Sequence, residues 1–158
     1  MAVKRHALGR RLIHFVAFGF GAGHAPAAPG TFGTLVAVPI YLLLREGGLA
    51  VYVGVVLAMF VAGIWLCGIT ERDLGAQDAP GIVWDEIVGY LIAMLAVPTG
   101  WPWVVAGFVL FRLFDIVKPF PIRTLERRVG GGLGVMLDDA LAGAYVLAIL
   151  HATAYAFR

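Results

Sequence analysis

Residues 49–69 read LAVYVGVVLAMFVAGIWLCGI, a run of 21 residues that contains no charged side chain. At about 1.5 Å per residue, a helix of this length covers the roughly 30 Å hydrocarbon thickness of a bilayer. The run therefore predicts a membrane-spanning helix. It also contains Cys67, the only cysteine, so a disulfide within the chain is excluded and the buried thiol is interpreted as a packing group.

The composition of the whole chain agrees with an integral membrane protein. Its 158 residues are 61% hydrophobic and 14% charged, and the mean hydropathy is +0.89, far from the averages of soluble domains. Working outward from residues 49–69, further apolar stretches occur at 34–44, 84–98, 101–114 and 140–157. We predict a single all-α domain over residues 1–158, an integral membrane helical bundle with about five short or full transmembrane helices.

The connections between these stretches predict the topology. Residues 19–33 are rich in Gly, Ala and Pro, which indicates a loop or re-entrant turn, with Thr31 or Thr34 capping the helix that follows. Basic clusters at residues 4–11 and 118–128 are expected in the cytoplasm by the positive-inside rule. With five crossings, the polar loops 70–83 and 115–139 both face the cytoplasm. His14 and Gly19 interrupt the first apolar stretch, so we expect no cleaved signal peptide.

Acidic residues concentrate in these two loops and at the helix starts beside them. Carboxylates near hydrocarbon cost about 2.5 to 3.5 kcal/mol on insertion scales, so such residues indicate a functional site. Acids at helix starts can instead complement the helix dipole, but two adjacent pairs, Asp85-Glu86 and Asp138-Asp139, favour a metal. Mg²⁺ prefers oxygen ligands and is usually shared with substrate phosphate. Seven of the ten acidic residues belong to this set: Asp73, Asp78, Asp85, Glu86, Asp115, Asp138 and Asp139.

Cations and glycines supply candidate phosphate contacts. Arg112, Asp115 and Lys118 are spaced along one side of a helix end, where they form either a salt-bridged terminus or a phosphate-binding pair of cations. The glycine-rich segments, including Gly30 with Thr31 and Gly132, present backbone amides to an anion or allow close helix packing. The four histidines are scattered and are interpreted as interfacial or packing residues. The net charge of +2 does not indicate nucleic acid as a partner.

Five ordered motifs give the chain a resemblance to a known family. They are residues 18–23 (FGFGAG), 29–34 (PGTFGT), 83–86 (VWDE), 111–112 (FR) with Asp115, Lys118, Pro119 and Pro121, and 131–134 (GGLG) leading to Asp138-Asp139 and Ala142-Gly143. Together they resemble the phosphatidylglycerophosphatase A family over roughly residues 15–145. Two departures from the family's pattern are Ala22 and Thr34, which stand where serine is expected.

The resemblance implies a Mg²⁺-dependent lipid phosphatase that converts phosphatidylglycerophosphate to phosphatidylglycerol in the bacterial inner membrane. The topology predicted above places its site on the cytoplasmic side. The acids that match the family's motifs, together with the cations and glycines considered above, give three sets of predicted site residues, which partly overlap. The catalytic set is Asp85, Glu86, Asp115, Asp138 and Asp139; the metal set is Asp85, Glu86, Asp138, Asp139 and Asp73; the phosphate or headgroup set is Thr31, Arg112, Lys118, Gly30 and Gly132.

The sequence leaves alternatives open for the nucleophile and for the class of reaction. Water activated by the metal is favoured over an aspartate nucleophile, because the chain lacks the Asp-x-Asp-x-Thr signature of aspartyl phosphatases. One alternative function is a phospholipid-headgroup transferase, which also uses aspartates and Mg²⁺. Another is a small ion-binding membrane transporter, which would place its acids at mid-span. The oligomeric state is left open.

Overall fold

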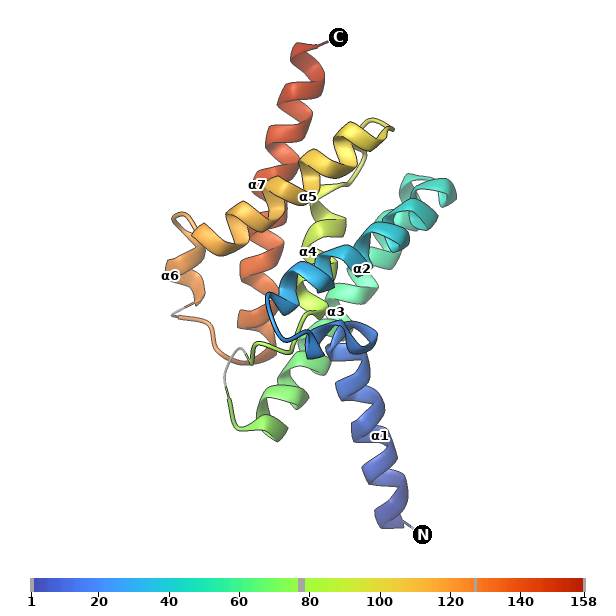
Figure 1. The fold of residues 1–158 in the computed structure, drawn as a ribbon, viewed down its shortest axis with the longest axis vertical. Helices are drawn as coiled ribbons and strands as arrows, with labels where there is room; N and C mark the ends of the chain where they lie inside the picture. The colour runs from blue at the N-terminus through green and yellow to red at the C-terminus, as the bar shows by residue number, and fades with distance from the viewer. Residues whose placement is uncertain (1, 77–78, 127, 158) are drawn as a thin grey trace.

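The computed structural model describes residues 2–76, 79–126 and 128–157, with the side chains of residues 2–7 and 126 outside the description. Within this part the chain is helical and contains no strand, which confirms the all-α prediction. The elements run in the order shown in Figure 1: α1 (Ala2–Ala17), η1 (Gly19–His24), α2 (Pro29–Leu44), η2 (Arg45–Gly47), α3 (Leu49–Leu74), α4 (Trp84–Ala93), α5 (Trp101–Val117), α6 (Ile122–Glu126) and α7 (Gly131–Ala156).

The short helix α4 is the centre of the bundle. Ile87, Val88, Tyr90 and Leu91 are completely buried on it, so apolar side chains face its neighbours on every side. Helices α2, α3, α5 and α7 all contact α4, and the contact with α7 is the most extensive. Because a helix that is apolar all round needs partners on all faces, α4 folds only as the core of the other helices.

Glycines set the distance between α4 and α7. A Cβ added at Gly89 would lie 2.7 Å from the carbonyl oxygen of Asp139, and one added at Gly143 would overlap the carbonyl oxygen of Gly89. The two helix backbones therefore approach each other at positions where only hydrogen fits, a packing mode common between membrane helices. This contact brings the first two turns of α4 against the third and fourth turns of α7.

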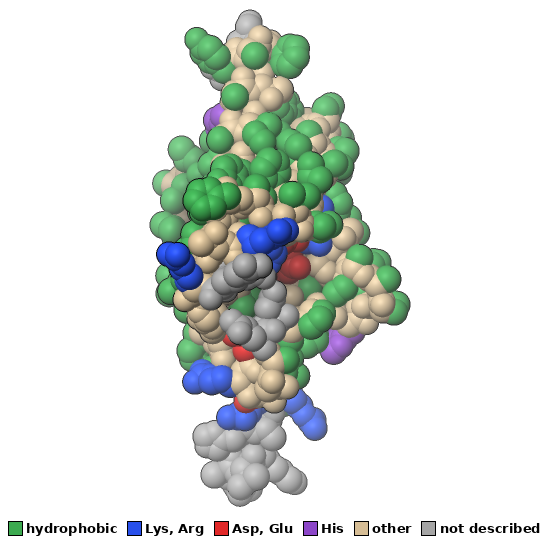
Figure 2. Space-filling model, turned by 90° about the vertical axis from the view of Figure 1, so that its left-hand side faces the viewer, with side chains coloured by type: hydrophobic (Ala, Val, Ile, Leu, Met, Phe, Trp, Pro, Cys, Tyr) green, Lys and Arg blue, Asp and Glu red, His purple; other side chains and the backbone are tan. Residues whose placement is uncertain are grey.

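Two helices are long and apolar enough to cross a membrane, α3 and α7. Helix α4 has 10 residues and extends roughly 15 Å, about half of the hydrocarbon thickness. The outer face of α3 exposes large apolar side chains, among them Leu57, Val61 and Trp65. Figure 2 shows hydrophobic side chains over the upper part of one face, with the charged side chains in its middle and lower parts. The number of crossings remains a prediction.

The start of α2 differs from the expected loop and cap. The helix begins at Pro29 instead of after residue 33, and Ala28 precedes it in a left-handed conformation without a side-chain cap. Thr31 and Thr34 lie inside the helix, where the Thr34 hydroxyl donates a hydrogen bond to the carbonyl of Gly30. The predicted threonine cap is therefore wrong, because proline at the first helical position already fixes the φ angle that starts the helix.

The polar loops are also shorter than expected. Helix α3 continues through Leu74, and α7 begins at Gly131, so Asp73, Asp138 and Asp139 lie on helices. At the end of α3, the hydroxyl of Thr70 and the guanidinium of Arg72 donate hydrogen bonds to carbonyls one turn back. Polar residues thus continue the helix past the apolar run. Helix α4, in contrast, ends at Ala93, before the predicted end at residue 98.

We predict that Gly143→Ala lowers the thermal midpoint of unfolding in detergent, because its methyl group would meet the Gly89 carbonyl. Overpacking of this kind costs about 1 to 3 kcal/mol. Gly54→Ala on α3 is the matched control, since an added Cβ there meets no atom within 4 Å. Its midpoint should stay the same or rise. An unchanged midpoint in Gly143→Ala would contradict the close α4–α7 contact.

Candidate functional site

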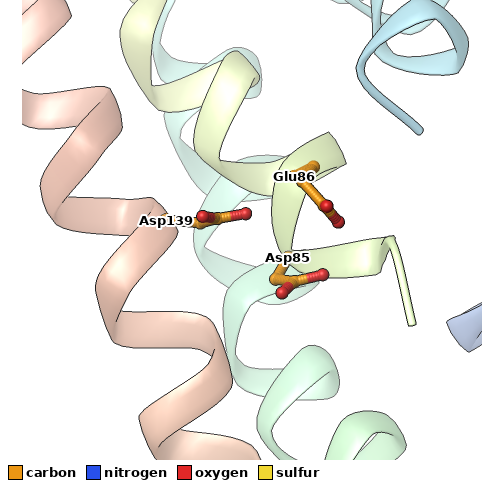
Figure 3. Close-up of side chains that lie close together, drawn as sticks. All are labelled: Asp85, Glu86 and Asp139. Atoms are coloured by element: carbon orange, nitrogen blue, oxygen red, sulfur yellow. The ribbon is translucent and has the colours of Figure 1, made fainter. Parts of the chain in front are cut away.

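Three acidic side chains from two helices meet in the interior (Figure 3). Asp85 and Glu86 come from the first turn of α4, and Asp139 comes from α7. One carboxylate oxygen from each lies within 4.8 Å of the others, close enough for all three to bind one metal ion. Asp85 and Asp139 are buried, and the Glu86 side chain is only 14% exposed. The structure thus brings together acids from two segments that lie more than fifty residues apart in the sequence.

The beginning of α4 is held in place by contacts with other helices. The backbone N–H of Val83 donates to the carbonyl of Ala17 at 3.0 Å, and the indole N–H of Trp84 donates to the carbonyl of Met59 at 3.1 Å. These bonds fix the residues immediately before the two acids. Gly89, one turn farther along, admits the backbone of α7 next to Asp139. The local sequence Val-Trp-Asp-Glu with a following glycine therefore positions the cluster.

Helix α5 adds one cation and a fourth carboxylate. Nη1 of Arg112 lies 2.7 Å from the Asp115 carboxylate and 3.7 Å from that of Glu86. Gly30, at the start of α2, leaves room for this pair, because a Cβ there would overlap Glu86 and lie 2.8 Å from Nη1 of Arg112. Arg112, Asp115 and Gly30 were all predicted site residues, and the structure brings them to the cluster.

The electrostatics of the cluster favour a bound cation. Burial raises the pKa of Asp85 well above its usual range, and the charges of Glu86 and Asp139 raise it further. Burial also raises the pKa of Glu86, to about 7. Both residues lie on α4, outside the two candidate spans. Each raised pKa means that the interior disfavours the ionised carboxylate, and a divalent ion bound at the cluster would stabilise the ionised form.

Unpaired oxygens support the same conclusion. One carboxylate oxygen each of Asp85, Glu86 and Asp139 is buried without a hydrogen-bond partner among the described residues. Leaving such an atom unsatisfied in the interior costs about 1 to 3 kcal/mol or more. The three oxygens belong to the same residues that come within metal-binding distance of one another. Hard carboxylate oxygens are ligands of Mg²⁺ and Ca²⁺, so this acidic group can hold a metal ion.

Asp138 faces a different partner from Asp139. Its carboxylate accepts a bond of 2.6 Å from Nζ of Lys118, and its other oxygen accepts from the backbone N–H of Asp139 at 3.1 Å. Predicted as a metal ligand, Asp138 lies outside the group of three described acids that come together. It instead connects Lys118, a predicted phosphate contact at the end of α5, to the helix that carries Asp139.

The remaining predicted residues lie elsewhere. Asp73 contacts Arg10 at 2.8 Å and His14 at 3.0 Å, and so joins α3 to α1. His14 thus has a charged partner that sequence reasoning missed, because the two residues are 59 positions apart. Thr31 lies in the first turn of α2, next to Gly30. A Cβ at Gly132 would overlap the Ile64 carbonyl, so this glycine serves close packing on α3. Asp78 lies outside the described residues.

A family model and several known proteins match most of this chain. The family model described as phosphatidylglycerophosphatase A matches residues 15–154. A protein of Escherichia coli (strain K12) named phosphatidylglycerophosphatase A is 45% identical over 139 residues, which cover 87% of this chain and 81% of that protein. One of the same name from Haemophilus influenzae is 41% identical over 145 residues, covering 90% and 89%.

A third relative carries a different name. A putative phosphatidylinositol-3-phosphatase of Bacteroides thetaiotaomicron is 45% identical over 135 residues, covering 80% of this chain and 84% of that protein. No solved structure matches the chain.

We predict that Mg²⁺ raises the thermal midpoint of the wild-type protein relative to EDTA, by the equivalent of about 2.7 kcal/mol at a hundredfold excess over the dissociation constant. Asp139→Asn should abolish this increase. It should also raise the midpoint in EDTA, because it removes one of several like charges in the cluster.

Asp73→Asn is the matched control for this measurement. It removes a carboxylate that pairs with Arg10 and His14, so the increase with Mg²⁺ should remain. If Asp139→Asn keeps the full increase, or if Asp73→Asn loses it, the assignment of the metal to the α4–α7 cluster is wrong.

Proposed function

We propose, since the chain belongs to the phosphatidylglycerophosphatase A family, that it hydrolyses the terminal phosphomonoester of phosphatidylglycerophosphate, with Mg²⁺ held by Asp85, Glu86 and Asp139. The products are phosphatidylglycerol and inorganic phosphate. One observation carries the assignment of the site: oxygens of three carboxylates, two buried and one partly buried, approach within 4.8 Å, and each residue has a buried oxygen without a hydrogen-bond partner among the described residues.

The chemistry of the ion suits this reaction. When bound, Mg²⁺ would polarise a phosphoryl oxygen and make a nearby water a better nucleophile. The residues that hold it contribute negative charge, which in the absence of a cation repels a dianionic phosphate. Metal and substrate therefore support each other's binding.

Arg112 is suited to hold the phosphate at this site. Its guanidinium can donate two parallel hydrogen bonds to phosphate oxygens, and its contacts with Asp115 and Glu86 fix its orientation. The absence of a side chain at Gly30 leaves space immediately beside the guanidinium. Asp115 thus acts by positioning Arg112. Asp138, through its bonds to Lys118 and to the Asp139 backbone, positions Asp139 in the same way.

The substrate class is a lipid with two phosphates. The names of the three relatives describe substrates that share a phosphodiester to diacylglycerol and a phosphomonoester on the headgroup. Phosphatidylglycerophosphate is the preferred candidate, because two of these relatives and the family model carry that name. A phosphorylated inositol lipid is the second candidate, favoured by the Bacteroides relative. Membrane lipid is the partner in both cases.

The proposed location is the bacterial inner membrane, with several crossings and the site facing the cytoplasm. The supporting features are the two candidate spanning helices and the basic residues near the ends of α3 and α5.

We predict phosphate release from phosphatidylglycerophosphate in detergent that depends on Mg²⁺ and is lost with EDTA. Asp85→Asn and Asp139→Asn should each lower kcat/KM by more than about 100-fold, the largest loss typical of residues that only support metal ligands. Glu46→Gln is the control, because Glu46 is exposed and pairs with Arg45 at the far end of α2. Wild-type activity in both aspartate variants would refute the site.

We predict that positions 46 and 128 lie on opposite sides of the membrane. In a Cys67→Ala background, Glu46→Cys should react with an impermeant maleimide in intact spheroplasts, and Arg128→Cys only after permeabilisation. Position 46 lies just before α3, which is expected to cross the bilayer to the cytoplasmic side. Position 128 lies just before the start of α7, which is expected on that cytoplasmic side. The reverse labelling pattern would place the site outside the cytoplasm.

A further inference from the structure

A cavity of about 440 Å³ with a basic lining lies between the end of α5 and α6. One of its lining residues, Lys118, bonds Asp138, the chain neighbour of Asp139 in the acidic cluster. Two of its lining residues are cationic and one carries a hydroxyl, so its polar atoms suit an anion. The site described above does not use this cavity, apart from Lys118. Its lining residues are Val117, Lys118, Pro119, Phe120, Arg123 and Thr124.

Arg123 is the cation of this cavity that remains available to a ligand. Its Nη2 donates to the carbonyl of Val117 at 3.2 Å, and the described side chains give it no carboxylate partner. The residue is exposed. A guanidinium has five N–H donors in a planar fork, so a single carbonyl contact leaves donors for phosphate oxygens.

Hydrogen bonds connect residues that line the cavity to α7, the helix that carries Asp139. Lys118 bonds the Asp138 carboxylate, and the hydroxyl of Tyr145 donates to the carbonyl of Phe120 at 2.9 Å. Ile122 is completely buried and anchors α6. These contacts attach both the wall of the cavity and the cluster to α7, so the two sites keep a fixed relation to each other.

Two of the residues that line the cavity are exposed apolar side chains, Phe120 at 81% and Val117 at 52%. Apolar side chains around a cationic pocket are typical of a region where a lipid headgroup meets protein at the bilayer interface. A free anion from solution would not require these apolar side chains.

We propose that this cavity binds the phosphodiester of the substrate, while the terminal phosphate lies at Asp85, Glu86 and Asp139. This inference rests on the proposed function, whose substrate carries both phosphates joined by a headgroup. Arg123 contacts the diester oxygens, and the acyl chains leave past Phe120. The cavity therefore selects lipids whose phosphomonoester is attached through a phosphodiester, as opposed to phosphatidic acid or a soluble phosphate ester.

The test measures phosphate release from phosphatidylglycerophosphate in detergent micelles, with Arg123→Gln as the variant. Glutamine keeps a donor for the Val117 carbonyl but removes the charge, so the fold is retained. We expect KM to rise about tenfold with kcat nearly unchanged. Inhibition by phosphatidylglycerol, which has only the diester, should weaken by the same factor, whereas inhibition by inorganic phosphate should not change.

Two further variants test whether the effect on KM comes from the charge at position 123. Arg123→Lys should recover most of the lost affinity, because the charge is restored. Arg72→Gln removes another exposed arginine that bonds a backbone carbonyl, on α3, and should leave KM unchanged. If it raises KM equally, the effect is a general attraction of anionic lipid and the proposal is wrong.

The remaining outcomes separate this inference from the proposed function. Unchanged KM in Arg123→Gln, or equal weakening of inhibition by phosphatidylglycerol and by inorganic phosphate, overturns the diester site while wild-type hydrolysis upholds the phosphatase. Absence of Mg²⁺-dependent hydrolysis in the wild-type protein overturns both.

Discussion

The contact between α4 and α7 is the interaction on which the rest of the structure depends. Gly89 and Gly143 let the two backbones touch, and this places Asp139 opposite Asp85 and Glu86. Like charges buried at this distance oppose folding, so the surrounding helices have to supply the compensating free energy. The complete burial of the apolar side chains on α4 provides it. The same short helix thus supplies much of the apolar core and two of the three acidic residues of the cluster.

The charged residues around this contact divide into groups with different roles. Among the described residues, three carboxylates each keep an oxygen without a hydrogen-bond partner and form the group that can hold a metal ion. Asp115 and Asp138 are paired with Arg112 and Lys118, which orients the cations and neutralises part of the negative charge. Because a buried ion pair is costly to break, these pairs hold the geometry around the unpaired group. Asp73 belongs to neither group, since its partners join α1 to α3.

The arrangement of polar and apolar surface fits a reaction on a lipid headgroup. The site uses the starts of α2 and α4, the end of α5 and the early turns of α7, while apolar residues cover the exposed faces of the longer helices. The cavity beside Arg123 lies where these two kinds of surface meet, next to the exposed Phe120. In the proposed substrate, the acyl chains match the exposed apolar residues, the phosphodiester matches the cavity, and the terminal phosphate matches the site at the acidic cluster. The proposed phosphatase site and the proposed site for the phosphodiester are both attached to α7.

The sequence by itself determined the helical class, the apolar run that became α3, and the adjacent acids Asp85 and Glu86 at a helix start. These features depend on local composition and on residues next to each other in the chain. Only the tertiary structure decided that Asp139 joins the cluster while Asp138 pairs with Lys118. The two aspartates are neighbours about 100° apart on a helix, so their roles depend on how α7 is rotated against α4. That rotation is fixed by glycine contacts between segments more than fifty residues apart, and no local pattern contains it.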